Sequence, residues 1–493
     1  MELNATRNLT AGTKTLLVML FAIMTGFMWR VRGDHGYGSM WGMFAVGVMM
    51  ILVIFAFFGN RKKMTYEAMP IAVILLGITN GGWGTLNSQM GGYLGSTVPF
   101  TGEEVDRIVS ISPWSGLWVM LLLGFGWMPL FALFIGSLFS EKKYKIKDYI
   151  ILIAVFYVVV YAFQFFVAHH ILPFIHPEAT AFFKEGLADK GIEMSPMMAY
   201  IKNLGSEAWF KKIPFGRNYF ASIRVISYSA AALITSFAAL VAKKDKVTFF
   251  ISTAINAVSA LAITLADVFL IIDSDAGFLG KINPPKFLEK GSWALWEYFT
   301  GFLLGFGIML ILVCLPKKIS GGEGAFEYSE PFRSKHIQGA YSAVMTLLFT
   351  FGITVARPLS MRIADIFVTK GIVEDEDTMT VILTVAICAV LLPFASAISK
   401  KNVIDRGLPI PVPMRLEDFC LKAAPVYFVI TAFNYFVIET DGNFSYALSV
   451  IKNPSPFTAM ARDAGVILLA LMLVSFVLFC VIYAAAAKSA KKK

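Results

Sequence analysis

Twelve long apolar runs constrain the fold of this chain more than any other feature of its sequence. A run of roughly 20 apolar residues, folded as a helix, spans the ~30 Å hydrocarbon core of a bilayer. Only 15% of the residues are charged and the mean hydropathy is +0.68, so a water-soluble core could not bury so much apolar surface. The sequence therefore predicts an all-α polytopic membrane protein with about 12 transmembrane helices. The runs cover 15–33, 40–59, 69–90, 113–139, 149–171, 219–242, 247–272, 292–315, 337–357, 379–398, 420–438 and 464–487.

Clusters of lysine and arginine indicate the orientation of these helices. They include NRKK at 60–63, KKDK at 243–246 and the tail KSAKKK. These clusters follow even-numbered apolar runs, namely the second, the sixth and the twelfth. Because basic residues concentrate on the cytoplasmic side, both termini are expected there. The net charge of +10 reflects this asymmetry, and no basic and aromatic nucleic-acid motif accompanies it, so no nucleic-acid partner is expected. The simplest location is a bacterial inner (plasma) membrane, crossed many times.

The chain carries signs of an internal two-fold repeat. FAIMTGFMWRVRGDHG (21–36) resembles LAITLADVFLIIDSDAG (261–277), and GSMWGMFAVGVMMILVIFAFFGNRKK (38–63) resembles GSWALWEYFTGFLLGFGIMLILVCLPKK (291–318). A true repeat predicts two six-helix halves, 1–246 and 247–493, as in transporters built from parallel repeats. Chance similarity between apolar helices is the alternative. The first half contains the longest outer loop, 172–218, whose pattern predicts short amphipathic helices.

The segment FMWRVRGDHGYGSMWG (27–42) places charges at the end of the first apolar run. Fifteen residues separate Lys14 from Arg30, about 23 Å of helix, which is shorter than the hydrocarbon core. Arg30 and Arg32 should therefore lie at the edge of the outer leaflet, where a charge snorkels or meets a partner. Asp34 could be that partner in a structural brace. The functional alternative is a clamp for an anion or a hydroxyl group, with His35 as proton carrier.

A glycine-rich segment, GITNGGWGTLNSQMGGYLG (77–95), interrupts the third apolar run. Asn80 lies near the middle of the bilayer, and Trp83, Asn87 and Gln89 follow towards the outer side. Non-helical backbone is tolerated at membrane depth only where protein or a water-filled cavity satisfies it. Broken helices bind substrates in transporters, whereas glycines alone also serve close helix packing. The amide side chains beside the glycines favour a binding segment.

Further polar residues lie at the outer ends of several other helices. Their occurrence on different helices indicates an outward-facing polar cavity, although each alone would suit an interfacial charge. All tryptophans except Trp127 map to the outer side. Aromatic faces beside charged groups suit a saccharide or an anion, and an aromatic belt is the plainer explanation. The candidate binding residues in this group are Arg224, Asp267, Trp293, Glu297 and Arg357.

Two functions fit these features. The first is secondary active transport of a small polar solute, with H⁺ or Na⁺ as coupling ion carried by Asp34, Asp267 or Glu297. The second is an integral-membrane transferase of a glycosyl, acyl or phosphoryl group at the outer face. It would act on a glycan or lipid-linked substrate, with Asp34 or His35 as general base. The twelve runs, the repeat and the broken third run favour transport.

No cofactor and no metal site is predicted. The four cysteines form no CxxC pair, and the spacing of His169 and His176 is not diagnostic of a metal site. No phosphate-binding loop or hydrolase motif is present. The expected partners are the lipid bilayer and either the solute or an outer-leaflet lipid-linked substrate.

Overall fold

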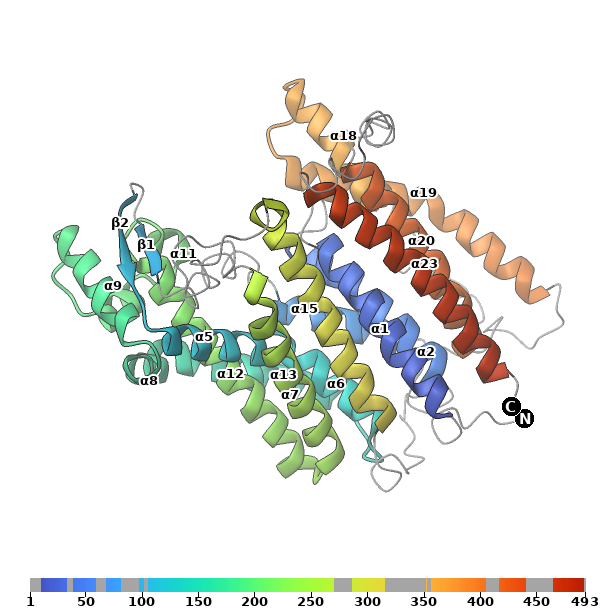
Figure 1. The fold of residues 1–493 in the computed structure, drawn as a ribbon, viewed down its shortest axis with the longest axis horizontal. Helices are drawn as coiled ribbons and strands as arrows, with labels where there is room; N and C mark the ends of the chain where they lie inside the picture. The colour runs from blue at the N-terminus through green and yellow to red at the C-terminus, as the bar shows by residue number, and fades with distance from the viewer. Residues whose placement is uncertain are drawn as a thin grey trace.

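The structure of the chain, a computed structural model, is predominantly α-helical (Figure 1). The prediction of a helical fold is therefore confirmed, apart from one antiparallel hairpin in the described part of the chain. That hairpin joins β1 (Thr97–Thr101) to β2 (Val105–Ser110), and the apolar-run pattern does not predict it. The structure describes residues 10–32, 39–58, 68–80, 97–101, 105–269, 286–314, 352, 356–404, 416–439 and 464–491.

Five helices in the described ranges are long and apolar enough to cross a membrane. A sixth candidate is a pair of helices, α5 (Pro113–Phe125) and α6 (Pro129–Phe139), bent by 49° at the break between them. The chain is thus a membrane protein, and the fourth predicted span is broken. The five are α1 (Ala11–Arg32), the continuous helix Ile146–Ile175, α12 (Gly216–Lys243), α13 (Lys246–Ala266) and the span Leu295–Cys314 of α15 (Lys286–Cys314).

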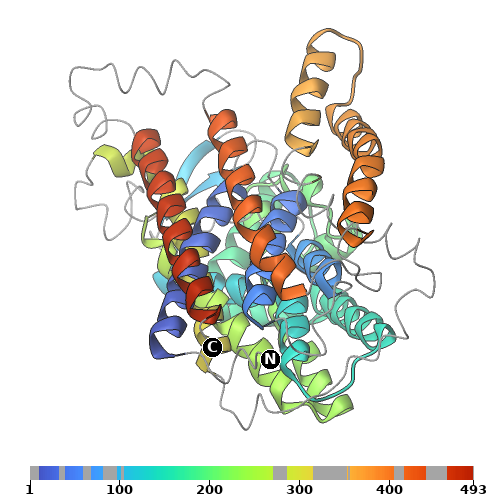
Figure 2. The same cartoon turned by 90° about the vertical axis from the view of Figure 1, so that its right-hand side faces the viewer.

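Shorter apolar stretches occur in four other helices. Two of these helices, α20 and α23, pack beside α2 and α1 respectively, whereas α18 and α19 pack on each other and project from the molecule (Figure 2). The remaining predicted spans fall on these helices or outside the described residues. The four helices are α2 (Ser39–Phe58), α3 (Ala68–Asn80), α20 (Leu416–Glu439) and α23 (Ala464–Lys491), and the projecting pair is α18 (Arg357–Thr369) and α19 (Glu376–Ile404).

The helix ends expected on the cytoplasmic side lie together. In Figure 1, the start of α1, the junction of α12 with α13, the end of α15 and the end of α23 all face the lower edge. α15 packs against α1 on one side and α13 on the other, and α13 also packs on α5, α6 and α12. The opposite ends of α1 and α13 therefore share one side of the helix bundle, which is the expected outer side.

Glycines bring α1 and α15 into close contact. A Cβ atom built on Gly301 would lie 2.4 Å from the backbone oxygen of Thr25, and one on Gly305 would lie 2.6 Å from that of Phe21. Gly301 and Gly305 form a GxxxG pair, the spacing that lets two helix backbones approach each other in a membrane. Glu297 lies one turn before Gly301 on the same face, so this contact carries it towards the end of α1.

Short helices pack against α12, and short helices were predicted for the 172–218 loop. The helix α7 (Ile146–Ala162) continues through one π-helical turn, η1 (Phe163–Val167), into α8 (Ala168–Ile175). Three shorter helices follow, α9 (Pro177–Asp189), α10 (Pro196–Lys202) and α11 (Glu207–Phe210). They pack through stacked aromatic rings, among them Phe183 on Tyr219 at 4.5 Å. We call residues 177–210 the cap.

Candidate functional site

Two arginines and one glutamate meet where α1 ends against α15. The Arg30 Nη1 atom donates a hydrogen bond to Glu297 Oε2 at 2.9 Å. The Arg32 Nη2 atom lies 3.9 Å from the other carboxylate oxygen of Glu297. The side chains of Arg32 and Glu297 are only 6% and 10% exposed. The charges at the end of the first helix are therefore drawn into the protein and do not snorkel towards water.

Two tryptophans enclose the Arg32 guanidinium. Its Cζ atom lies 5.5 Å from the ring centre of Trp29 and 5.7 Å from that of Trp127. The two indole rings meet edge to face, with centroids 5.2 Å apart. Trp127 lies in the break between α5 and α6, so the bend places an aromatic face against the charge. Contacts of this kind stabilise a desolvated cation by about 2 kcal/mol each.

A second buried carboxylate, on α13, contacts the α15 residue that precedes Glu297. Asp267, at the C-terminal end of α13, is 0% exposed and accepts a hydrogen bond from the indole nitrogen of Trp296 at 2.5 Å. Its other oxygen, Oδ2, is buried without a hydrogen-bond partner in the described part of the chain. Trp296 and Glu297 are consecutive, so both acidic groups adjoin the same turn of α15. We call Trp29, Arg30, Arg32, Trp127, Asp267, Trp296 and Glu297 the charged layer.

The structure brings together four of the predicted site residues: Arg30, Arg32, Asp267 and Glu297. Arg224 instead lies over the Phe220 and Tyr228 rings of its own helix α12, and Arg357 begins α18. Asn80 ends α3 and Trp293 lies within α15, but their side chains are outside the described part of the structure. Five other predicted residues are outside the described residues altogether, namely Asp34, His35, Trp83, Asn87 and Gln89.

Trp29, Trp127 and Trp296 belong to the charged layer but not to the predicted site. Trp127 was expected deeper than the other tryptophans, and its role depends on the bend that follows Gly126. The sequence GFGWMP (124–129) carries a signal for this bend, since glycines precede and a proline follows the tryptophan. The GxxxG pair after Glu297 is a second available signal, because it marks which helix face packs closely.

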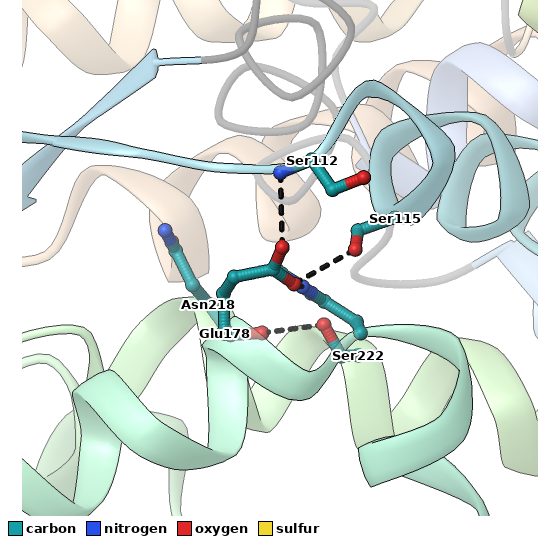
Figure 3. Close-up of polar contacts among 6 residues, drawn as sticks. Ser112, Ser115, Glu178, Asn218 and Ser222 are labelled. Carbon is teal, nitrogen blue, oxygen red and sulfur yellow. Dashed lines mark hydrogen bonds and ion pairs between the residues drawn. The ribbon is translucent and has the colours of Figure 1, made fainter.

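A separate polar cluster joins the cap to α5 (Figure 3). The carboxylate of Glu178 accepts hydrogen bonds from the Ser112 backbone N–H at 3.0 Å and from the Ser115 hydroxyl at 2.8 Å. His176 Nδ1 lies 3.1 Å from the same carboxylate. Behind it on α12, the Ser222 hydroxyl donates to the backbone carbonyl of Asn218. Burial raises the pKa of Glu178, but these hydrogen bonds outweigh it and lower the pKa to about 2.

This cluster has a structural explanation. Ser112 is the N-cap of α5, and its own side chain makes no capping hydrogen bond. Glu178 instead accepts a hydrogen bond from the backbone N–H of this N-cap residue, and its negative charge suits the positive end of the helix dipole. The two histidines bond to different groups, His176 to Glu178 and His169 to the Tyr219 hydroxyl. Within the described ranges, no three potential metal-binding side chains gather.

No protein-family model, curated protein or solved structure matches this chain.

Proposed function

We propose that the chain is a secondary transporter and that its charged layer binds a small anionic or hydroxylated solute. The observation that carries this proposal is the state of Arg32. Its guanidinium is almost completely buried, and its Nε atom has no hydrogen-bond partner in the described part of the chain. The Glu297 carboxylate oxygen beside its Nη2 atom lies 3.9 Å away. A buried arginine with an unmet donor is costly, and an anionic group on a solute would satisfy it.

The surroundings of Arg32 support the same class of ligand. The guanidinium is a planar fork of donors, which matches a carboxylate or phosphate. Glu297 bridges Arg30 and Arg32, so an incoming anion would compete with it for the two cations. The indole faces of Trp29 and Trp127 also suit the C–H face of a saccharide. The expected solutes are therefore organic acids, acidic sugars and sugar phosphates.

The position of the layer supports transport. α1 and the bent α5–α6 pair come from the proposed half 1–246, and α13 and α15 come from the proposed half 247–493. Transporters with repeated halves bind their solutes between the halves, often beside a discontinuous helix. We include in the proposal twelve spans, cytoplasmic termini and a bacterial plasma-membrane location. Asp267 and Glu297 are the described carboxylates that could carry the coupling ion, H⁺ or Na⁺.

A transferase is the second candidate, and one observation favours it. Arg30 and Arg32 end α1, and Asp267 ends α13, so the charged layer lies at helix ends that a lipid-linked substrate in the outer leaflet could reach. The proposed general bases of this reaction, Asp34 and His35, are outside the described residues. The formation of a product without net movement of the substrate across the membrane would favour the transferase over the transporter.

Binding tests the solute class directly. The detergent-purified full-length protein is titrated with organic acids, acidic sugars, sugar phosphates and neutral sugars. An acidic compound is expected to bind, and Arg32→Gln is expected to weaken it at least tenfold. Lys212→Gln, which removes an exposed positive charge from the surface, is the matched control and should bind like the parent. Equal affinity in a folded Arg32→Gln protein would contradict the assignment.

A further inference from the structure

A polar stripe runs along the buried face of α13. Thr248, Ser252, Asn256 and Ser259 follow one another at intervals of four, four and three residues, which places them on one side of the helix. None of these side chains is more than 2% exposed. The Ser252 hydroxyl donates to that of Ser236 on α12 at 2.9 Å, so the stripe faces the neighbouring helices and not the lipid.

Asn256, near the middle of α13, is not satisfied by its neighbours. Its side chain is 0% exposed, and in the described part of the chain neither its amide nitrogen nor its amide oxygen has a hydrogen-bond partner. The buried hydroxyls of Thr235 on α12 and Thr300 on α15 are in the same state. A buried polar group without a partner costs about 1–3 kcal/mol. Such groups on α13 and on the two helices α12 and α15 that pack against it point to something that the protein atoms do not supply.

Helix packing alone does not account for these groups. Hydroxyls in a dry helix contact usually donate to the carbonyl four residues earlier, as Ser222 and Ser227 of α12 do. The side-chain amide of Asn256 lacks partners for its N–H donors and for its oxygen acceptor. Water can supply both kinds of partner, because it donates and accepts hydrogen bonds. A bare cation fits less well, because the amide nitrogen would face it. The stripe also carries no carboxylate between Asp245 and Asp267.

We propose that the buried face of α13 holds a chain of internal water molecules, centred on Asn256, that conducts protons between the charged layer and the cytoplasmic end of the helix. Asp267 stands at one end, and Asp245 at the other accepts hydrogen bonds from Thr248 and Tyr144. A proton leaving the protonated Asp267 carboxyl passes to the adjacent water and leaves a carboxylate behind. The path rests on the proposed transport function and deepens it, because it names the proton as the coupling ion.

Ile263 closes the path at its outer end. It lies four residues after Ser259 and four before Asp267, on the same face of α13, and is 1% exposed. An apolar side chain offers no hydrogen bonds to water, so it interrupts the chain of water molecules. The path is therefore shut between Asp267 and Ser259 in this structure.

Removing this apolar plug tests the proposal. The full-length Ile263→Ser protein is reconstituted into liposomes, and proton influx is driven by a potassium diffusion potential and followed with a pH-sensitive dye inside. The influx is expected to rise at least tenfold above the parent's. The double variant Ile263→Ser/Asn256→Leu should return to the parent's rate, because leucine removes the amide that holds the water. Leu261→Ser, on the exposed face of the same helix, is the matched control and should change nothing.

The outcomes separate this proposal from the transport function. A folded Ile263→Ser protein without added proton influx overturns the water path, and so does an influx that Asn256→Leu leaves intact. If Ile263→Ser does not fold, Ile263→Thr, which keeps more of the side-chain volume and adds a hydroxyl, takes its place with the same expected increase. If Ile263→Ser conducts protons but the parent protein transports no solute, the transport proposal is overturned and the water path stands.

Discussion

At the scale of single residues, Arg30 and Arg32 are satisfied in different ways. Arg30 donates a direct hydrogen bond to Glu297, whereas Arg32 relies on two indole faces and a carboxylate oxygen 3.9 Å away. Ring contacts compensate less of the cost of desolvating a charge than a charged hydrogen bond does. Arg32 therefore has more to gain from an anion than Arg30. Arg32→Gln should therefore weaken binding of an anion more than Arg30→Gln does.

The short distance from Lys14 to Arg30 predicts a position at the edge of the outer leaflet and leaves open whether the arginines snorkel towards water or meet a partner. Their partner is less predictable, because Glu297 lies 267 positions from Arg30 and meets it only through helix packing. Asp34, the partner expected from proximity in sequence, is outside the described residues. Asp267 and Glu297 were predicted site residues, but nothing local to either one indicates which arginine or tryptophan it contacts.

Glu178 supplies a prediction about pH. Its pKa in the folded protein, about 2, lies below the ordinary value of 4.5. The carboxylate therefore stabilises the fold above about pH 4.5, and this stabilisation is lost as the pH falls towards 2. Glu178→Gln should lower the free energy of unfolding at neutral pH by about 1.5–3 kcal/mol, the usual range for hydrogen bonds to a charged group.

The measurement is thermal unfolding in detergent between pH 2 and pH 7. The difference in unfolding temperature between the parent and Glu178→Gln should be largest at neutral pH, and it should shrink as the pH falls below about 4.5. Glu193→Gln removes an exposed carboxylate from the same cap and serves as the control. A gap that is the same at every pH would show that the charge of Glu178 does not anchor the cap.

At the scale of elements, the close contact of α1 with α15 positions the charged layer. Glu297 and Gly301 share one face of α15, so the distance between the helix axes at Gly301 sets how near Glu297 comes to Arg30. Gly26 contributes from the other side, where an added Cβ would lie 3.0 Å from the backbone oxygen of Tyr298. The ion pair thus depends on residues that carry no charge.

Gly301→Ala tests this dependence. The new Cβ would meet the Thr25 backbone oxygen at 2.4 Å, and because backbone cannot move aside as a side chain can, the helices must separate. We expect a loss of about 1–3 kcal/mol in the free energy of unfolding, typical of overpacking, together with weaker solute binding. Gly12→Ala on α1, where the nearest atom is 3.9 Å away, should be neutral or slightly stabilising. If Gly301→Ala is as stable as the parent and as Gly12→Ala, the claim that α1 and α15 are in close contact at Gly301 is wrong.

Helices are the part of the fold that the sequence predicts best. The predicted runs 219–242 and 247–272 correspond to α12 and α13, and the predicted short helices of the outer loop are α9, α10 and α11. The bend between α5 and α6 was missed because both helices are apolar throughout, so hydrophobicity alone does not mark the break. The β1–β2 hairpin was missed for the opposite reason, since it lies in a polar connection between the runs.

At the scale of the whole molecule, two buried polar regions adjoin along α13. The charged layer lies at one end of this helix, and the stripe through Asn256 leads from there towards the opposite end. A solute site at one side and a proton path to the other are the parts that proton-coupled transport requires. The sequence indicates the solute site through its charges. It does not indicate the proton path, because serine, threonine and asparagine in an apolar helix are equally typical of close helix packing.

Uptake of the acidic solute that binds best tests the central claim most directly. The full-length parent, Arg32→Gln and Lys212→Gln are reconstituted into liposomes, and the radiolabelled solute is followed inside them with an inward proton gradient. The parent and Lys212→Gln should accumulate the solute above its external concentration, and Arg32→Gln should be reduced at least tenfold. Binding by the parent with no accumulation, or accumulation that Arg32→Gln leaves unchanged, would contradict the account.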